Sequence, residues 1–192
     1  MKKILVLLTL TPLAALAEPQ SWSIDPAHSQ TTFSVRHMVI STVRGAFQKT
    51  SGTVKLDEAD PSRSSVEATI DAASIDTRVE QRDGHLRSPD FFDVAKYPNI
   101  TFHSTKVEKV SAGKLKVTGD LTIHGVTKSV VLDVEGPTEA IKDGKGLRRG
   151  LTATTSINRQ DYGLKWNKMV EAGPIVGDEV KIEIEAEIVS AG

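Results

Sequence analysis

The chain has 192 residues, no cysteine, and 24 basic against 25 acidic residues, which gives a formal net charge of −1. Without cysteine there can be no thiol nucleophile, iron–sulfur cluster or thiolate zinc site. Acidic and basic residues are interspersed and form no basic stripe, so nucleic acid is not expected as a partner. The length fits a single domain.

The N-terminal segment has the features of a secretory signal peptide. Two lysines precede an apolar stretch, and Ala15-Leu16-Ala17 forms a small-x-small cleavage site. The stretch is shorter than the roughly 20 residues that a membrane span needs. We therefore expect residues 1–17 to be removed between Ala17 and Glu18. Residues 18–192 would then form the mature domain, exported to the periplasm.

Runs of alternating apolar and polar residues dominate the chain after this segment. In the last run, residues 180–188, valine, isoleucine and alanine alternate with lysine and glutamate. Strict alternation is typical of a strand with one dry face and one wet face. Similar runs, separated by turn residues, occur near positions 33–35, 54–56, 66–70, 100–102, 115–123, 130–134 and 151–157. The sequence therefore predicts an all-β fold of about eight antiparallel strands.

Small residues recur in the inward phase of these runs. They are Ala68, Gly119, Ala153, Thr155 and Ala186. A closed barrel of eight strands is wide enough for side chains or one small ligand. Small inward residues leave a cavity, although they also occur where strands curve. The pattern favours a hollow barrel over a packed sandwich, and we expect open space beside Gly119 that a phenylalanine could fill.

A polar, charge-rich segment, residues 74–92, interrupts the alternation. Thr77 and Glu80 have the spacing of a capping box, which predicts that a helix begins there. Ser88-Pro89 predicts a second helix start. The segment ends in Phe91-Phe92, so we expect a short helical insertion that acts as a lid or base plate of the barrel.

Two arginines of this segment, Arg78 and Arg82, lie four residues apart and would share one face of the expected helix. A guanidinium near the mouth of a barrel can hold a phosphate head group through paired hydrogen bonds. The alternative is ion pairing with Glu80 and Asp83, which is common in helices of mixed charge. The sequence leaves both interpretations open.

Five histidines are present, and none has the spacing of a metal-binding motif, so neither a metal nor a cofactor is expected. Asp25 with His28, and Asp83 with His85, are expected to be hydrogen-bonded pairs that fix loops. His37 shares the phase of the inward residues before it and is expected to face the interior.

A nucleophilic triad of Ser74, Asp83 and His85 can be named, but the Gly-x-Ser-x-Gly elbow is absent. The alternative is that Ser74, Asp76 and Thr77 cap the following helix. We therefore expect a protein that is not an enzyme.

Residues 159–177 form another irregular segment, which carries Tyr162, Trp166 and Met169. It can be a surface excursion with a few buried anchors, or a flap over a mouth of the barrel. The pattern does not decide between the two.

Several motifs occur in a characteristic order along the mature chain. They include Phe33-Ser-Val-Arg-His37, Gly45-Ala-Phe47, Arg82-Asp83-Gly84-His85-Leu86, Tyr97-Pro-Asn-Ile-Thr-Phe102, Gly119-Asp-Leu-Thr-Ile-His124-Gly125 and Asn158-Arg-Gln-Asp161-Tyr-Gly163. Their order and spacing resemble the YceI family of periplasmic lipid-binding proteins. This resemblance implies an antiparallel barrel of lipocalin-like shape whose interior holds an isoprenoid or a similar long apolar chain.

Together these observations predict a carrier or sequestering protein that binds an isoprenoid or another amphiphilic lipid inside the barrel. The residues expected to line the interior and its mouth are Phe33, Val35, His37, Phe47, Phe91, Phe92, Phe102, Leu121, Ile123, Leu132 and Trp166. The alternatives are an enzyme acting on a small lipid or ester, and a stress-linked binding module without a dedicated ligand. Strands of about ten residues give a barrel of about 25 Å, shorter than the longer polyprenyl chains. This motivates two further expectations, transient contact with a membrane and a homodimer.

Overall fold

The computed structural model describes residues 18–144, 146–170 and 173–191, and the expected signal peptide, residues 1–17, lies outside them. Most of the described chain is β-structure. The strands are β1 (Gln20–Ile24), β2 (Gln30–His37), β3 (Ser41–Phe47), β4 (Thr50–Leu56), β5 (Ser65–Asp71), β6 (Ile75–Asp76), β7 (Asn99–Ser111), β8 (Lys114–Ile123), β9 (Val126–Glu135), β10 (Ile141–Asp143), β11 (Gly146–Asn158), β12 (Met169–Val170), β13 (Gly173–Pro174) and β14 (Val176–Ala191). The helices are α1 (Glu80–Arg87) and the 3-10 turns η1 (Pro61–Arg63), η2 (Ala72–Ser74) and η3 (Arg159–Tyr162).

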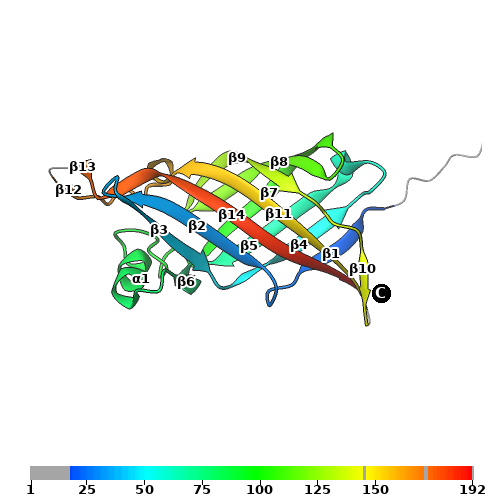
Figure 1. The fold of residues 1–192 in the computed structure, drawn as a ribbon, viewed down its shortest axis with the longest axis horizontal. Coiled ribbons are helices and arrows are strands. Elements are labelled where there is room, and N and C mark those ends of the chain that lie inside the picture. Colours follow the sequence, from blue (N-terminus) through cyan, green and yellow to red (C-terminus); the bar gives the residue numbers. More distant parts are fainter. Residues whose placement is uncertain (1–17, 145, 171–172, 192) are drawn as a thin grey trace, which may run out of the picture.

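Antiparallel strands close into a barrel (Figure 1). β1 and β2 both pair with β14 and follow one another along it, so they form one interrupted strand. β3 and β4 do the same, with β3 on β2 and β4 on β1. The wall continues through β5, β7, β8, β9 and β11, and β11 pairs with β14 to complete the circle. The predicted eight-stranded antiparallel barrel is confirmed.

The connection from β5 to β7, residues 72–98, carries α1 at one end of the barrel (Figure 1). The same connection includes β6, which pairs with the edge of β3 that faces away from β2, through Ala46 opposite Asp76 and Phe47 opposite Ile75. We call this the α1 end. The opposite end, where β1 begins and β14 finishes beside β10, is the base end (Figure 1). The predicted short helical insertion is confirmed.

The helix begins later than the capping box predicts, so that prediction is wrong in detail. Val79 is the N-cap residue and makes no side-chain cap hydrogen bond, while Glu80 is exposed. Thr77 is buried, and both its N–H and its hydroxyl donate to Asp83 Oδ1. A buried carboxylate inside the helix therefore takes the role that we expected of Glu80.

The second predicted helix start, at Ser88-Pro89, is also wrong. The Ser88 hydroxyl donates to the carbonyl of His85 at 2.7 Å, which closes the end of α1. The following residues form a turn in which the Phe91 N–H donates to the Ser88 carbonyl at 3.0 Å. The serine thus ends one helix instead of beginning another.

The alternation of β14 corresponds to the two faces of the wall. Val180, Ile182, Ile184, Ala186 and Ile188 all face the interior cavity, while the charged residues between positions 180 and 186 are exposed. The apolar residues of the other strands form the buried clusters of the barrel interior. Burial of apolar surface is the main stabilising contribution to such a fold.

The interior beside Gly119 is filled, contrary to the expectation of open space. A Cβ atom at this position would lie 2.4 Å from Cζ of Phe102 and 2.6 Å from the carbonyl oxygen of His103. The missing side chain therefore makes room for a neighbouring aromatic ring instead of leaving a void. A phenylalanine at Gly119 would overpack the wall.

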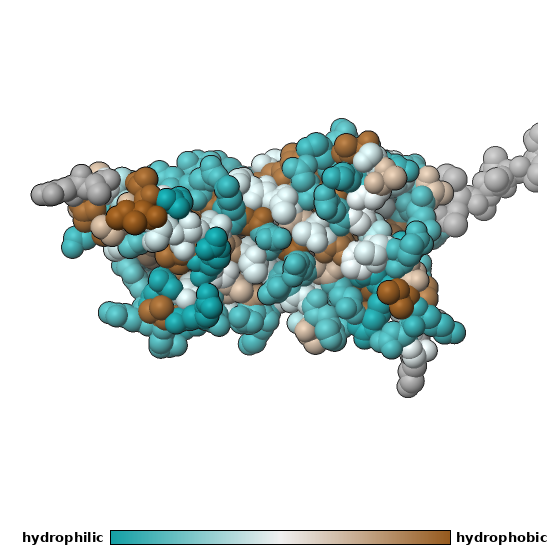
Figure 2. Space-filling model, in the orientation of Figure 1, coloured by the Kyte–Doolittle hydropathy of each residue, from teal (hydrophilic) through white to brown (hydrophobic). Residues whose placement is uncertain are grey.

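The outer surface is mostly hydrophilic over the strands (Figure 2). Apolar side chains gather at the α1 end, over β12 and β13 and near the β2–β3 turn (Figure 2). Val39, Ile40 and Met169 are the exposed large apolar residues of these segments. Within the described ranges, no helix is long and apolar enough to span a bilayer.

Candidate binding cavity

A cavity of about 230 Å³ runs inside the barrel. At the α1 end its wall includes Leu86, Phe91 and Phe92, and toward the base end it includes Leu56 and Ile188. Every barrel strand contributes inward side chains to it. The cavity therefore follows the barrel axis and is lined by the dry faces that the alternating sequence predicts.

The cavity wall is hydrocarbon with few polar exceptions. Thr31 and Thr50 line it, and their hydroxyls satisfy each other at 3.3 Å. Thr155 also lines it, and its hydroxyl donates to the Val131 carbonyl at 2.9 Å. An engineered apolar cavity of about 150 Å³ stays dry and takes up benzene. A larger cavity with the same character suits an apolar ligand that is thin enough to lie along the barrel.

The structure brings most of the predicted interior residues together. Those that line the cavity are Phe33, Val35, Phe47, Phe91, Phe92, Phe102, Leu121, Ile123 and Leu132. Two others do not line it. His37 is half-buried at the last position of β2, opposite Ser41 and Val176, and Trp166 lies behind Phe91. Contact of any of these residues with a ligand stays a prediction.

Aromatic rings close the α1 end. Phe47 packs against Phe33 and edge-on against Phe92, with ring centroids 5.7 Å apart in both pairs. The Trp166 ring lies 5.3 Å from that of Phe91 and packs edge-on against His85 at 4.8 Å. The irregular segment after β11 thus covers this end of the cavity with an aromatic anchor, as the flap interpretation requires.

Arg159 fastens that segment and is the main residue here that sequence reasoning missed. It is buried, and it lines the cavity at the α1 end. All five of its N–H groups donate, to the carbonyls of Leu164, Trp166, Val176 and Gly177 and to the carboxylate of Asp178. Burial lowers the pKa of Arg159, and Asp178 partly offsets this. Because no donor is left over, we assign Arg159 a positioning role.

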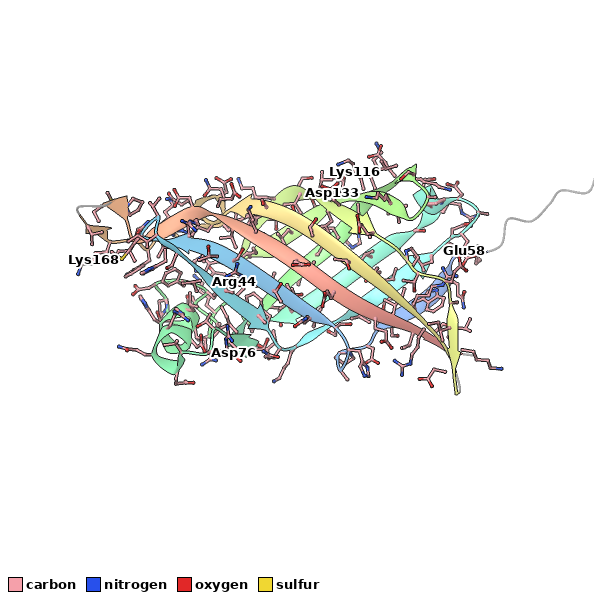
Figure 3. All side chains as sticks on the ribbon, viewed as in Figure 1. Arg44, Glu58, Asp76, Lys116, Asp133 and Lys168 are labelled. Carbon is pink, nitrogen blue, oxygen red and sulfur yellow. The ribbon has the colours of Figure 1, made fainter. Side chains whose placement is uncertain are left out.

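The two arginines expected at a head group lie elsewhere. Arg82 donates to the hydroxyl of Thr77 at 2.7 Å and to its carbonyl at 2.8 Å, which fastens α1 to the preceding strand. Arg78 lies outside the helix and is exposed in a polar groove on the outer surface, which Arg44 and Asp76, both labelled in Figure 3, also line. Because Arg78 lies outside α1, the prediction that the two arginines share a helix face is wrong. Neither arginine lines the cavity, and their contact with a head group stays a prediction.

The residues of the nucleophilic triad are hydrogen-bonded to other groups. The Ser74 hydroxyl donates to the Asp71 carbonyl at 2.6 Å, and His85 Nε2 lies 2.9 Å from the Asp90 carboxylate. Asp83 accepts from Thr77. The expected pair of Asp83 with His85 is therefore wrong, and the three residues do not form a base–nucleophile relay.

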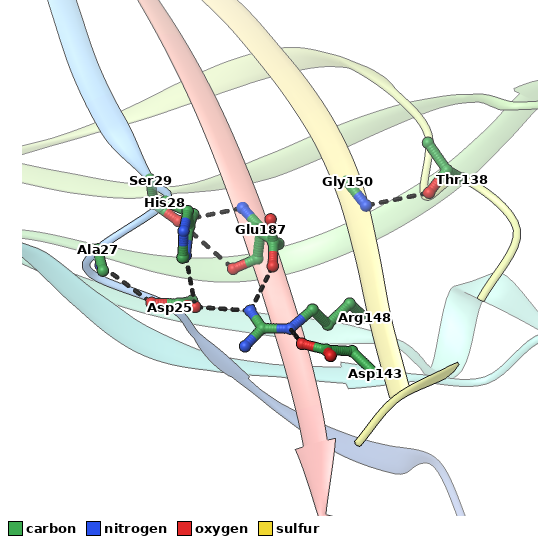
Figure 4. Close-up of polar contacts among 9 residues, drawn as sticks. All are labelled: Asp25, Ala27, His28, Ser29, Thr138, Asp143, Arg148, Gly150 and Glu187. Atoms are coloured by element: carbon green, nitrogen blue, oxygen red, sulfur yellow. Dashed lines mark hydrogen bonds and ion pairs between the residues drawn. The ribbon is translucent and has the colours of Figure 1, made fainter. Parts of the chain in front are cut away.

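The pair of Asp25 with His28 is present, at 2.9 Å, and belongs to a larger network on the outside of the base end (Figure 4). Arg148 donates to Asp25, Glu187 and Asp143. Hydrogen bonds from His28, then from Arg148, hold the pKa of Asp25 well below its usual range, and Asp25 raises the pKa of His28. Asp25, His28 and Glu187 have ligand atoms within 4.8 Å of one another, but the guanidinium binds both carboxylates. The cluster is thus built around an internal cation.

Comparison with known proteins identifies the barrel. A model of the YceI-like domain matches residues 22–188, which reach from β1 to near the end of β14. The chain belongs to the YceI-like family. The resemblance carried by the ordered motifs is therefore confirmed over nearly the whole described barrel.

Relatives within the YceI-like family support the assignment. A UPF0312 protein of Vibrio parahaemolyticus is 35% identical over 177 residues, which cover 92% of this chain and 89% of the relative. The crystal structure of the YceI protein of Campylobacter jejuni has a TM-score of 0.70 at 34% identity and covers 82% of this chain and 90% of that one. The BcnA protein of Burkholderia cenocepacia has a TM-score of 0.74 at 28% identity, covering 85% and 98%.

A more distant likeness concerns the fold alone. A domain of Saccharophagus degradans described as polyisoprenoid-binding and implicated in plant cell wall breakdown has a TM-score of 0.65 at 19% identity. The match covers 89% of this chain and 98% of that domain. The two proteins share the YceI barrel.

Proposed function

We propose that this YceI-like protein carries or sequesters a long apolar lipid, an isoprenoid or a similar amphiphile, inside its barrel. The observation that carries the proposal is the apolar cavity along the barrel axis. The polyisoprenoid-binding description of the Saccharophagus degradans domain, which has the same fold, supports the isoprenoid as ligand class. Burial of each methylene contributes about 0.8 kcal/mol, so a long chain gains ample gross binding energy.

The cavity is smaller than the roughly 300–1,000 Å³ of typical ligand pockets. A bound chain must therefore be thin, and inward side chains must change rotamer to admit a long one. A homodimer that extends the cover over a protruding chain is part of the proposal. Light scattering on lipid-loaded and empty protein tests it, because a monomer in both states would contradict it.

We also propose that the protein works in the periplasm after removal of its signal peptide. The support is the lysine pair, the apolar stretch and the Ala15-Leu16-Ala17 site. N-terminal sequencing of protein from an osmotic-shock fraction should begin near Glu18. Intact Met1 in a cytoplasmic fraction would contradict this proposal.

The carrier proposal is tested by purifying the protein gently from its host, extracting it with organic solvent and analysing the extract by mass spectrometry. We expect a long-chain lipid in amounts comparable to the protein. Empty protein would instead favour a binding module without a dedicated ligand. Turnover of simple esters, abolished by Ser74→Ala, would favour an enzyme.

A cavity-filling variant tests where the lipid lies. Ala153 is buried and lines the cavity, so Ala153→Phe should occupy the space of the ligand. We expect lipid recovery to fall at least tenfold while the protein stays folded, since the new ring enters existing space. In a packed core the same change would cost about 1–3 kcal/mol by overpacking. Thr154→Phe, at the neighbouring exposed position of β11, is the matched control and should retain lipid.

A further inference from the structure

Three side chains at the base end carry buried polar atoms without a hydrogen-bond partner among the described residues. They are Nε1 of Trp22, Nε of Arg149 and Oγ of Ser190. Trp22 is 1% exposed, Ser190 is 5% exposed, and the Arg149 side chain is 12% exposed. Among all described residues, the Tyr162 hydroxyl is the one other buried side-chain polar atom without a hydrogen-bond partner. Native proteins leave few buried polar groups unpaired, so a cluster of three needs an explanation.

The three side chains are neighbours on adjoining strands. Ser190 of β14 lies opposite Leu147 of β11, which places Arg149 two residues farther along the same strand. The guanidinium carbon of Arg149 lies 5.3 Å from the ring centroid of Trp22 on β1. Three strands that are distant in sequence therefore bring these polar atoms to one place.

All three side chains share the inward phase of the cavity wall. Trp22 lies two positions from Ile24, Arg149 two positions from Leu151, and Ser190 two positions from Ile188. Each of the apolar residues in these pairs lines the cavity. Two residues along a strand correspond to about 7 Å. The polar cluster therefore lies beside the base end of the cavity, in the layer of Val54, which lies opposite Trp22 and lines the cavity.

The unpaired atoms are mostly hydrogen-bond donors. An indole N–H and a guanidinium Nε–H can only donate, and a serine hydroxyl can donate or accept. A group that satisfies all of them must present oxygen acceptors. The apolar wall in front of the cluster means that such a group arrives attached to a hydrocarbon chain, or as water.

The charges around the cluster disfavour an anion. Arg149 already forms an ion pair with Glu58, which lies at the base end of the barrel and is 67% exposed (Figure 3). On the outside of the same end, Arg148 binds three carboxylates. The positive charge is thus neutralised nearby, and a phosphate would meet an excess of acidic groups.

From this arrangement we infer that Trp22, Arg149 and Ser190 form a head-group site for a neutral oxygen-bearing lipid, such as a long-chain alcohol or carbonyl compound. The inference rests on the proposed lipid-binding function and adds an orientation to it. The head group lies at the base end, and the chain extends through the cavity toward α1. Displacement of Glu58 is not required.

Fluorescence tests the orientation, because the chain has two tryptophans and they lie at opposite ends of the cavity. The probes are two long-chain alcohols, one brominated beside the hydroxyl and one brominated at the chain terminus. Trp166→Phe leaves Trp22 as the reporter, and the difference from the wild type gives Trp166. We expect the head-brominated alcohol to quench Trp22 more strongly, and the tail-brominated alcohol to quench Trp166. The reverse pattern, or equal quenching, would overturn the assignment.

Affinities test the chemistry. The probes are a twenty-carbon prenyl alcohol, its monophosphate and the matching hydrocarbon, each measured by displacement of a fluorescent apolar dye. Ser190→Ala removes one hydroxyl, and Arg149→Lys keeps the charge opposite Glu58 while removing the Nε donor. We expect either variant to weaken binding of the alcohol about three- to tenfold, the usual size of one hydrogen bond. Binding of the hydrocarbon should not change.

Ser129→Ala, an exposed serine on the outer face of β9, is the matched control and should bind all three probes like the wild type. Unchanged alcohol affinity in both cluster variants would mean that the cluster holds only water, and a larger loss for the monophosphate would mean a charged head group. Each of these results overturns the inference. If the wild type binds none of the three probes, the proposed function itself fails.

Discussion

Arg159 and His28 are two charged side chains whose surroundings decide what they can do. Arg159 lies against an apolar cavity, and it is tolerated there because every N–H has an acceptor. His28 lies on the surface of the base end and gains its properties from Asp25 and the neighbouring Glu187. Arg159 holds the segment after β11 in place, and His28 responds to pH.

Arg159→Lys should destabilise the protein by about 2–4 kcal/mol. A lysine has three donors on one nitrogen and cannot reach acceptors spread over three directions, so several buried carbonyls lose their partner. Urea unfolding measures the change. Arg44→Lys, an exposed position on β3, is the control and should stay within about 0.5 kcal/mol of the wild type (Figure 3). Similar small effects for both variants would argue against the role given to Arg159.

His28→Gln should change how stability depends on pH. The folded state raises the pKa of His28 above 6.5, so the stabilisation is fully present below that pH and is lost as pH rises through the folded pKa. The melting temperature of the wild type should therefore exceed that of the variant most at mildly acidic pH, and the gap should narrow in alkaline buffer. Thermal melts across about pH 5 to 9 test this. A gap that widens with pH would contradict it, and His103→Gln controls for loss of an exposed imidazole.

At the scale of one element, α1 is held by its own side chains against the strand that precedes it. Asp83 accepts two hydrogen bonds from Thr77, and Arg82 donates two more to the same residue. Arg87 donates to the carbonyls of Ala73 and Ile75. The helix has a single buried side chain, Asp83, and Leu86 packs half-buried against the core, so these polar contacts supplement a narrow apolar face.

Replacement of Asp83 should matter more than loss of the residue that the capping box designates. Asp83→Ala leaves a buried N–H and hydroxyl of Thr77 without an acceptor, which we expect to cost about 2–3 kcal/mol. Glu80→Ala removes an exposed carboxylate and should stay within about 0.5 kcal/mol of the wild type. Urea unfolding of the two variants compares these arrangements directly. A larger loss of stability in Glu80→Ala than in Asp83→Ala would instead support a capping box of Thr77 with Glu80.

The β2–β3 turn shows another feature of the element scale. Met38 and Val39 have φ angles of 51° and 59°, a region in which asparagine and glycine are preferred and a β-branched residue is strained. The Arg36 side chain donates to the Val39 carbonyl and helps to hold this conformation. The turn thereby presents apolar side chains to solvent at an energetic cost, which is common at functional sites.

For the whole molecule, the two ends of the barrel differ in chemistry. The α1 end exposes Val39, Ile40 and Met169, while the base end carries the Asp25–Arg148–Glu187 network outside and the Trp22–Arg149–Ser190 cluster inside. A lipid that enters head first from a membrane at the apolar end would leave its chain trailing toward that membrane. A head-group site at the base end is therefore geometrically compatible with lipid exchange at the α1 end.

Ile40→Asp should slow lipid transfer from the loaded protein to vesicles by several-fold, because it places a charge in the apolar surface at the α1 end. The measurement is the rate at which a fluorescent lipid moves to neutral phospholipid vesicles. Ile141→Asp alters an isoleucine of similar exposure at the base end and should leave the rate unchanged. Equal slowing by both variants would mean that transfer does not depend on which end meets the membrane.

The sequence by itself determined the strands, their dry and wet faces and the family. These properties are local, because an alternation of period two fixes which residues of a strand face inward whatever its neighbours are. The same argument identified most of the cavity wall, from Phe33 on β2 to Leu132 on β9. The sequence also points to Arg149, because this arginine interrupts the inward apolar series of β11.

Only the tertiary structure decided which inward positions are empty and which polar groups are paired. The ring of Phe102 from the neighbouring strand occupies the space beside Gly119. Arg159 donates to Asp178, which lies beyond the irregular segment in sequence. Arg148 binds Asp25 although 123 positions separate them in the chain. Hydrogen bonds and ring contacts act over a few ångströms, so their partners are set by strand register and barrel closure, and these depend on the whole chain at once.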